Sequence, residues 1–361
     1  MKTVLEIITQ PTSTIISLIE GSLNQVGFWI KGNRITGKAC ILIDKNVSRI
    51  YWDSIKKSLD EYMIEYDNIS VECTEAGKTF LSVGTIVDTM LDKGFSRHDY
   101  VVTIGGGIMG DMGGFVAGIY MRGLPLFHIP TTLISQVDSC IGGKVGVNSV
   151  KGKNALGMFV HPQSVLIDPG TLLSLDERNY LSGIAEIIKY GLIRNPDLVC
   201  KLEQCATAVQ RREIDILRDI IWDCILIKKQ LVEIDEKDFG IRRILNYGHT
   251  LGHAIESNTD YKRYLHGEAI SIGIAFASHL SVKAGYLDKS DYMRIIRLLD
   301  LYGLPSSWID FNPENLIDSI HRDKKRKTKN TMILLKKIGE TIIDEEIEDN
   351  HILESLKDFR I

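Results

Sequence analysis

Three histidines and one glutamate in the second half of the chain have side chains suited to binding a divalent metal ion. His249 and His253 lie four residues apart in NYGHTLGHAIES, an amphipathic pattern that predicts a helix with both imidazoles on one face. His266 follows in YLHGEA, and Glu186 lies among apolar residues in GIAEIIKYG, where a carboxylate requires a partner. The set indicates a metal site with open positions for substrate oxygens. The spacing does not decide which histidines would bind the ion.

Cationic and polar residues in the middle of the chain could surround an anionic, hydroxylated substrate. Many of them lie in or after the glycine-rich stretch QVDSCIGGKVGVNSVKGKN, whose low helical propensity favours loops. Arg242 and Asn246 are four residues apart, which predicts one helical turn leading into the histidine helix and a carboxylate-binding guanidinium beside the metal. The other members of this group are Asp138, Lys144, Lys153, Asn154, Lys189 and Lys228. The group suits a substrate with both a carboxylate and a phosphate.

A glycine-rich turn has the spacing of a dinucleotide-binding loop. Gly105, Gly107 and Gly110 match G-x-G-x-x-G directly after the strand-like DYVVTI and before an apolar helical segment, where backbone N–H groups can cradle a pyrophosphate. The ribose-binding acid usually found about 20 residues later is missing, because the chain there reads LPLFHIPTT. Asp44, which ends ILID, could bind a ribose hydroxyl instead, or it could simply cap the next helix. The glycines alone are also compatible with mere close packing.

Two kinds of structure must position these residues. Up to HPQSVLID, short apolar runs alternate with helical patterns near 50–66 and 80–93, which predicts a largely parallel sheet covered by helices. After that point the sequence consists of long helical segments. We therefore expect an α/β domain over residues 1–175 and a mostly α-helical domain over residues 176–361.

The composition argues against several other classes of protein. A length of 361 residues suits two domains, and 44% hydrophobic with 25% charged residues is ordinary for globular proteins. A net charge of −4 gives no general attraction to nucleic acid or to an anionic membrane. Neither a signal peptide nor a membrane-spanning apolar run is visible, and no cysteine pair has CxxC spacing, so we expect a cytoplasmic protein with free thiols.

Longer strings of the sequence occur in the order and at the separations of one enzyme family. They are GGGIMGDMGGFVAGIYMRG, IPTTLISQVDSCIGGKVGVN, KGKNALGMF, GIAEIIKYGLI, RRILNYGHTLGHAIE and LHGEA, and they span most of the chain. In these strings the chain resembles the 3-dehydroquinate synthases, within the sugar-phosphate cyclase superfamily. The resemblance implies an N-terminal Rossmann-like NAD-binding domain, a C-terminal helical metal-binding domain, an active site between them and a homodimer.

The resemblance also implies a role for individual residues. Glu186, His249 and His266 would bind zinc or cobalt, which leaves His253 as a polar group facing the substrate. The NAD site would contain Asp44, Glu75, Lys78, Gly106, Gly107, Asp111, Thr131, Thr132, Lys144 and Lys153, the two last also bordering the substrate. Substrate positions would be Asp138, Asn154, Lys189, Lys228, Arg242 and Asn246. Arg122 would reach the phosphate in the neighbouring subunit, and Lys325 in HRDKKRK would bind phosphate.

The implied reaction converts 3-deoxy-arabino-heptulosonate 7-phosphate into 3-dehydroquinate and phosphate, a step of the shikimate pathway towards aromatic amino acids. NAD would oxidise a ring hydroxyl, phosphate would leave, and the NADH just formed would reduce the enone before ring opening and an intramolecular aldol addition.

Three alternatives differ in chemistry. Cyclases that make valiolone, deoxy-inosose or aminodehydroquinate keep NAD and metal but differ at the substrate positions, where Lys228 and Arg242 here suit a carboxylate. A metal-dependent polyol dehydrogenase would release NADH instead of recycling it. A non-catalytic nucleotide-binding protein would be expected to have lost a metal ligand or a catalytic lysine.

Overall fold

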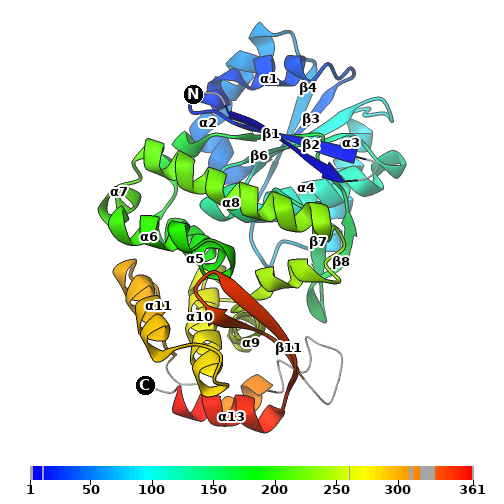
Figure 1. The fold of residues 1–361 in the computed structure, drawn as a ribbon. Helices are drawn as coiled ribbons and strands as arrows, with labels where there is room; N and C mark the ends of the chain where they lie inside the picture. The colour runs from blue at the N-terminus through cyan, green and yellow to red at the C-terminus, as the bar shows by residue number, and fades with distance from the viewer. Residues whose placement is uncertain (1–2, 10–11, 260, 309–311, 318–329, 360–361) are drawn as a thin grey trace. The chain divides into compact units, whose positions relative to one another are not determined.

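The computed structural model describes residues 3–9, 12–259, 261–308, 312–317 and 330–359 (Figure 1). The chain divides into two compact units, of which the first consists of Met1–Leu175 and Lys228–Glu233. The second unit consists of Asp176–Ile227 and Ile234–Ile361. The segment Lys228–Glu233, which the expected boundary at residue 175 assigns to the C-terminal half, therefore groups with the first unit.

The first unit contains a seven-stranded sheet with the order β1-β2-β9-β6-β5-β3-β4. The pair β1–β2 is antiparallel and the other neighbouring strands are parallel, which confirms the predicted largely parallel sheet. The strands are β1 (Thr3–Thr9), β2 (Thr12–Leu18), β3 (Ala39–Asp44), β4 (Tyr66–Val71), β5 (Tyr100–Gly105), β6 (Leu126–Pro130) and β9 (Ser164–Ile167). A separate antiparallel hairpin is formed by β7 (Lys144–Ser149) and β8 (Gly152–Phe159).

Helices cover both faces of this sheet because its central strands carry apolar side chains on both faces. In β3, Cys40 and Leu42 pack into the core formed with α3 (Phe80–Asp92) and α4 (Gly107–Ile119). Ile41 and Ile43 point to the other face and pack with α1 (Val26–Gly32) and α2 (Lys45–Glu61). Strands buried on both faces are typical of parallel sheets with helices on each side. Short helical turns are η1 (Ser22–Gln25), η2 (Tyr120–Arg122), η3 (Ser135–Ser139) and η4 (Pro169–Ser174).

The order of the strands creates a switch point at the carboxyl ends of β3 and β5. From β3 the chain passes through α2 to β4 on one side, and it then crosses through α3 to β5 on the other side of β3. Ligands of open α/β sheets bind outside the carboxyl ends of the strands at such a point. Asp44 ends β3, and Gly105 ends β5 directly before α4.

The second unit is mostly helical. Its elements are α5 (Glu177–Arg194), α6 (Pro196–Gln204), α7 (Ala206–Gln210), α8 (Ile214–Ile234) apart from residues 228–233, η5 (Ile241–Asn246), α9 (His249–Asn258), α10 (His266–Lys283), α11 (Lys289–Leu301) and α13 (Asp349–Asp358). It also contains the antiparallel hairpin β10 (Asn330–Lys337) and β11 (Glu340–Ile347), which the sequence analysis did not predict. Gly339, with φ 90°, lies in the turn of this hairpin.

Two further findings concern the whole described chain. All six cysteines are free thiols, as predicted from the absence of CxxC spacing. None of the helices within the described ranges combines the length and the apolar composition that crossing a membrane would require.

Candidate functional site

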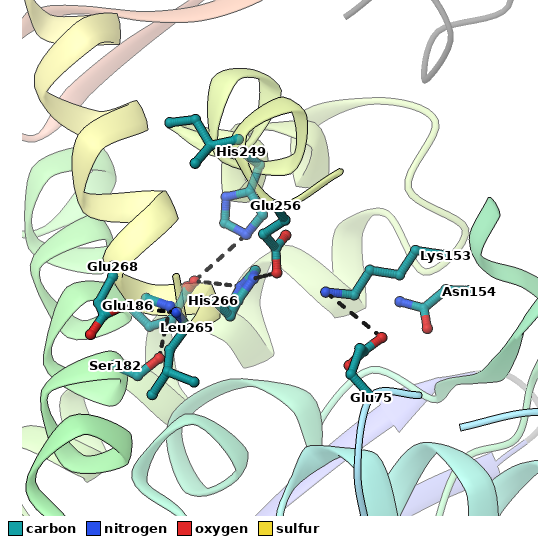
Figure 2. Close-up of polar contacts among 12 residues, drawn as sticks. Glu75, Lys153, Asn154, Ser182, Glu186, His249, Glu256, Leu265, His266 and Glu268 are labelled. Carbon is teal, nitrogen blue, oxygen red and sulfur yellow. Dashed lines mark hydrogen bonds and ion pairs between the residues drawn. The ribbon is translucent and has the colours of Figure 1, made fainter. Parts of the chain in front are cut away.

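The second unit brings one carboxylate and two imidazoles together (Figure 2). Glu186 is fully buried in α5, between the equally buried Ala185 and Ile187. Its Oε1 lies 3.6 Å from Nε2 of His249, the first residue of α9, and 3.4 Å from Nε2 of His266, the first residue of α10. The three ligand atoms thus come from three helices and converge on one place.

Glycines allow these helix starts to approach one another. The amide of Gly267 donates to Ser182 Oγ at 2.7 Å, and a Cβ at Gly267 would lie 2.3 Å from Ser182 Cα. Ser182 is one turn before Glu186, so this contact sets His266 beside the carboxylate. Gly248 precedes His249 with φ 80°, and a Cβ there would lie 2.9 Å from the amide nitrogen of Ile274 in α10. Both close approaches require glycine.

The hydrogen bonds of the rings define how the imidazoles are protonated. Nδ1 of His249 lies 3.2 Å from the backbone oxygen of Tyr247, which can only accept, so Nδ1 carries the proton and Nε2 presents a lone pair to Glu186. Burial, with Lys189 nearby, lowers the pKa of His249 to about 3. Burial would also lower the pKa of His266, but contacts with Glu186 and Glu256 outweigh it and raise that pKa to about 9.

This arrangement fits a divalent metal ion. The lone pair of His249 Nε2 faces a carboxylate oxygen at 3.6 Å, and two acceptors in this geometry favour a cation between them. A tetrahedral zinc site with bonds of about 2.1 Å separates its ligand atoms by roughly 3.4 Å. The separations of 3.4 and 3.6 Å from Glu186 Oε1 agree with that geometry. Three protein ligands would leave a position open for an oxygen of a substrate.

A second group of potential ligands overlaps the first. His253, Glu256 and His266 also place ligand atoms within 4.8 Å of one another. As predicted from their spacing, His249 and His253 share a face of α9, with ring centroids 5.3 Å apart. Glu256 Oε1 lies 3.3 Å from Nδ1 of His266, the nitrogen directed away from Glu186. Glu256 therefore contacts the outer side of the His266 ring.

Other predicted residues of the second unit lie in α5 and η5. Lys189 is buried, and its ammonium lies 2.5 Å from the second carboxylate oxygen of Glu186. The helical turn predicted for Arg242 and Asn246 is present as the 3₁₀ helix η5, and the left-handed Gly248 lies between η5 and α9. Arg242 is buried and donates to the backbone oxygen of Glu236 at 2.6 Å, whereas Asn246 is exposed.

In the first unit, several predicted NAD-site residues meet at the carboxyl edge of the sheet. Asp44 caps α2 by accepting from the amides of Asn46 and Val47, so the capping role considered from the sequence is confirmed. A Cβ on Gly105 would lie 3.2 Å from Asp44 Cβ, and one on Gly106 would lie 2.9 Å from Thr132 Cγ2. These short distances show that glycine permits close packing of the chain around the start of α4.

This edge also contains a buried hydroxyl group that makes no hydrogen bond within the described residues. Thr131 follows β6 and is 4% exposed, and its Oγ1 has no hydrogen-bond partner within the described residues. A buried hydroxyl of this kind suits a polar ligand group. With the amides at the start of α4, whose N-terminus favours anions, the edge could hold a dinucleotide.

The remaining polar residues of the first unit form a connected network. Lys78 donates to Asp111 and, at 2.5 Å, to Asn154 Oδ1. Lys153 Nζ lies 4.0 Å from Glu75 Oε1. Asn148 in β7 donates to Glu75 Oε1 at 2.8 Å and accepts from the amide of Asn154 at 2.8 Å. The loop before α3 is thereby tied to the β7–β8 hairpin.

Other predicted residues have different surroundings. Lys228 Nζ donates to the side chain of Asp138 and, at 2.5 Å, to its backbone oxygen. Lys144 is exposed at the start of β7. Arg122 is exposed and adopts φ 72°, a left-handed conformation that is unusual for a residue with a side chain. The predicted phosphate ligand Lys325 lies outside the described residues.

Comparison with known proteins identifies the family. Models described as 3-dehydroquinate synthase N-terminal and C-terminal match residues 68–182 and 183–326. A 3-dehydroquinate synthase from Dictyoglomus thermophilum is 46% identical over 293 residues, covering 80% of this chain and 81% of that protein. One from Thermoanaerobacter pseudethanolicus is 39% identical over 337 residues, covering 93% and 94%. The chain belongs to the 3-dehydroquinate synthase family.

Solved structures of related enzymes share the fold of this 3-dehydroquinate synthase family member. The 2-epi-5-epi-valiolone synthase of Streptomyces hygroscopicus, solved with NAD⁺ and Zn²⁺, has a TM-score of 0.90 and 27% identity, covering 98% of both chains. A 2-deoxy-scyllo-inosose synthase, solved with carbaglucose-6-phosphate, NAD⁺ and Co²⁺, has a TM-score of 0.87 and 25% identity, covering 99% of this chain and 100% of that one. An iron-containing alcohol dehydrogenase at 16% identity and a TM-score of 0.70 shares the fold alone.

Three residues that contact the predicted sites were missed by the sequence analysis. Glu256 contacts His266, Gly267 sets the start of α10 against α5, and Asn148 joins Glu75 to Asn154. Asn148 and Gly267 lie inside quoted motifs of the 3-dehydroquinate synthase family, in KVGVN and LHGEA, and Glu256 is the last residue of RRILNYGHTLGHAIE. Those motifs were the available signal.

Proposed function

We propose that this chain is a 3-dehydroquinate synthase, which converts 3-deoxy-arabino-heptulosonate 7-phosphate into 3-dehydroquinate and phosphate. The similarity to 3-dehydroquinate synthases over most of the chain supports this activity. The observation that carries the chemistry is the convergence of Glu186 Oε1 with Nε2 of His249 and His266, because the reaction needs a metal ion with open coordination positions. The cofactors are NAD and a divalent metal ion, as in the related cyclase structures.

Glu186, His249 and His266 are the proposed ligands of that ion. When bound, the ion supplies a Lewis acid for the substrate hydroxyl, and NAD accepts and returns a hydride. The deep burial of Glu186 keeps the carboxylate in one orientation, and the Tyr247 carbonyl holds His249 with Nε2 available for the ion. Lys189, paired with Glu186, is placed to donate to a substrate oxygen close to the ion. His253 is the neighbouring polar group for the substrate.

The proposed NAD site is the carboxyl edge of the sheet in the first unit. The start of α4, with Gly106 and Gly107, would bind the pyrophosphate, and Asp44 would bind a ribose hydroxyl. Thr131 offers its buried hydroxyl. The other proposed NAD contacts are Glu75, Lys78, Asp111, Thr132, Lys144 and Lys153.

The substrate's two anionic groups would be bound by cationic side chains. We assign Lys228 and Arg242 to the carboxylate, because both are buried cationic side chains that can donate charge-assisted hydrogen bonds to it. Asp138, Asn154 and Asn246 are assigned to the hydroxyl and ring oxygens. Arg122 and Lys325 are assigned to the phosphate, Arg122 from the partner in a homodimer. We also propose that the protein acts in the cytoplasm, as an enzyme of the shikimate pathway.

Phosphate release from a substrate panel tests this function. The protein would be assayed with catalytic NAD and zinc or cobalt on 3-deoxy-arabino-heptulosonate 7-phosphate, on sedoheptulose 7-phosphate and on a polyol, each with and without a chelator. We expect turnover of the first compound alone, sensitivity to the chelator, and no net NADH. Turnover of sedoheptulose 7-phosphate instead would assign a different cyclase activity, and stoichiometric NADH from the polyol would assign a dehydrogenase.

The matched family domains and the two compact units support a division of cofactor binding and metal binding between the two parts of the chain. We infer that residues 1–175 form the NAD-binding domain and that residues 176–361 form the metal- and substrate-binding domain, with Lys228–Glu233 attached to the former. Isothermal titration with NAD on a variant that lacks the metal ligands would test this division, because NAD binding should persist.

A further inference from the structure

Glu256 has the position of a residue that acts on the metal site without binding the ion. It lies in α9, two turns after His249, and is 3% exposed, an unusual environment for a carboxylate. Its Oε1 is 3.3 Å from Nδ1 of His266, whose opposite nitrogen faces Glu186 at 3.4 Å (Figure 2). The ring of His266 is thus held between two buried carboxylates.

The outer nitrogen, Nδ1, contacts a different kind of acceptor in each of the two ligand histidines. His249 uses the backbone oxygen of Tyr247, which no side-chain substitution removes. His266 uses the side chain of Glu256. A carboxylate that accepts the outer N–H of a ligating imidazole fixes the ring orientation, keeps the inner nitrogen available for the ion and makes that nitrogen a stronger donor. The support of His266 therefore depends on a single side chain.

We propose that Glu256 is a positioning residue that orients His266 and strengthens its bond to the catalytic ion. This inference rests on the proposed function, because it takes Glu186, His249 and His266 as the ligands. It assigns to Glu256 a role in metal affinity and in the ligand geometry of the ion, and no contact with the substrate.

The competing arrangement is a separate ion held by His253, Glu256 and His266. If His266 served that ion through Nδ1 and the first ion through Nε2, its ring would have to lose its last N–H proton. A neutral imidazole that donates Nδ1–H to Glu256 and gives Nε2 to the ion avoids this loss. The geometry therefore favours one ion per chain.

Metal binding to the metal-free protein tests the proposal independently of turnover. Zn²⁺ affinity would be measured by competition with a chromophoric chelator for the parent, Glu256→Ala and Glu256→Gln, and the Co²⁺ form of each would be examined by visible absorption. We expect the Ala variant to bind Zn²⁺ about 10- to 100-fold more weakly. The Gln variant should lose less, because its amide oxygen still accepts from Nδ1. The Co²⁺ absorption bands should shift in both.

Glu268→Gln is the matched control. Glu268 is a carboxylate in the first turn of the same helix as His266, but it accepts from the Leu265 amide and pairs with Arg178. Its loss removes the same charge near the site and should leave Zn²⁺ affinity and the Co²⁺ spectrum close to those of the parent. Urea unfolding of each variant, compared with the parent, reports whether it is folded.

The results separate failure of this inference from failure of the proposed function. Parent-like Zn²⁺ affinity in Glu256→Ala would overturn the positioning role, and so would two ions per parent chain falling to one in that variant. His266→Ala shows which claim has failed. If His266→Ala binds Zn²⁺ like the parent, the ligand assignment itself is wrong; if it binds weakly while Glu256→Ala does not, only the role of Glu256 is wrong.

Discussion

The proposed metal site of the second unit and the polar network of the first unit are built in different ways. In the metal site, acceptor atoms on three helices converge around the fully buried Glu186, an arrangement that suits a cation. In the polar network, side chains from a loop, a helix and a hairpin contact each other, as Lys78 does with Asp111 and Asn148 with Glu75. The first arrangement concentrates its function in a few atoms, whereas the second distributes it over many contacts.

This difference predicts different responses to substitution. Loss of one atom from a convergent site removes a ligand that nothing else replaces. Loss of one contact from a connected network is partly compensated by its neighbours, so single effects should be smaller and non-additive. The predictions that follow proceed from the largest expected effect to the smallest.

Glu186→Gln should have the largest effect. The substitution keeps the size of the side chain but removes the charge shared by His249 and His266, so Zn²⁺ affinity should fall by more than the ~100-fold typical of outer-sphere changes. Phosphate release should be lost, and NAD affinity should be unchanged. Chelator competition and NAD titration provide the measurements. A variant that binds Zn²⁺ like the parent would show that the convergent site is not the metal site.

Gly267→Ala should disturb the same site through the backbone. The added Cβ would lie 2.3 Å from Ser182 and force α10 away from α5, which should lower the free energy of unfolding by about 1–3 kcal/mol and weaken Zn²⁺ binding. Gly84→Ala in α3 is the control, since no atom lies within 4 Å of its Cβ position and alanine should stabilise the helix by about 0.5–1 kcal/mol. Urea unfolding distinguishes the two. Equal stability and equal Zn²⁺ affinity of the two variants would show that Gly267 does not position His266.

Asn148→Ala should weaken the polar network without abolishing it. It removes the hydrogen bonds to Glu75 and to the Asn154 amide, while the backbone contact between Asn148 and Lys78 remains. We expect NAD to bind roughly 5- to 10-fold more weakly, equivalent to about 1–1.4 kcal/mol. Zn²⁺ affinity should stay the same, as calorimetry on both ligands would reveal. An effect on Zn²⁺ larger than on NAD would break the comparison between the two regions.

His128→Gln should have the smallest effect, and only in acid. His128 is buried in β6 beside Thr103, and burial lowers its pKa to about 4 from an ordinary 6.5. The unfolded chain therefore gains a proton below about pH 6.5 that the folded chain does not accept, and stability falls as the pH drops towards 4. Between pH 7.5 and 5.5 the parent should lose about 1 kcal/mol more than the variant in urea unfolding. Identical pH dependence would contradict this assignment.

The sequence revealed the convergent site better than the network. Three histidines and a glutamate among apolar residues indicated metal binding, and the family motifs selected Glu186, His249 and His266 as the ligands. The spacing alone could not select these ligands. The approach of α5, α9 and α10 to one another depends on close packing at Gly248 and Gly267. Glu256 was missed because a helical glutamate usually faces water, and its burial follows only from tertiary packing.

The polar network, the β10–β11 hairpin and the segment around η5 were also predicted incompletely from the sequence. Asn148 acts through register between a hairpin and a loop, which depends on contacts far apart in the sequence. The β10–β11 hairpin was missed although ILLKKIGETII has a glycine turn between apolar runs, since the helical pattern around it dominated the interpretation. The turn expected for Arg242 and Asn246 is η5, but the spacing did not indicate that the left-handed Gly248 would separate it from α9.

The most direct test is a metal titration of the metal-free protein during turnover. Zn²⁺ would be added stepwise with 3-deoxy-arabino-heptulosonate 7-phosphate and less than one NAD per substrate molecule, while phosphate release and NADH absorbance are recorded together. The account predicts that turnover rises linearly and stops rising at one ion per chain, with many phosphates released per NAD and no accumulation of NADH. Full turnover without metal, or one NADH accumulating per phosphate, would contradict it.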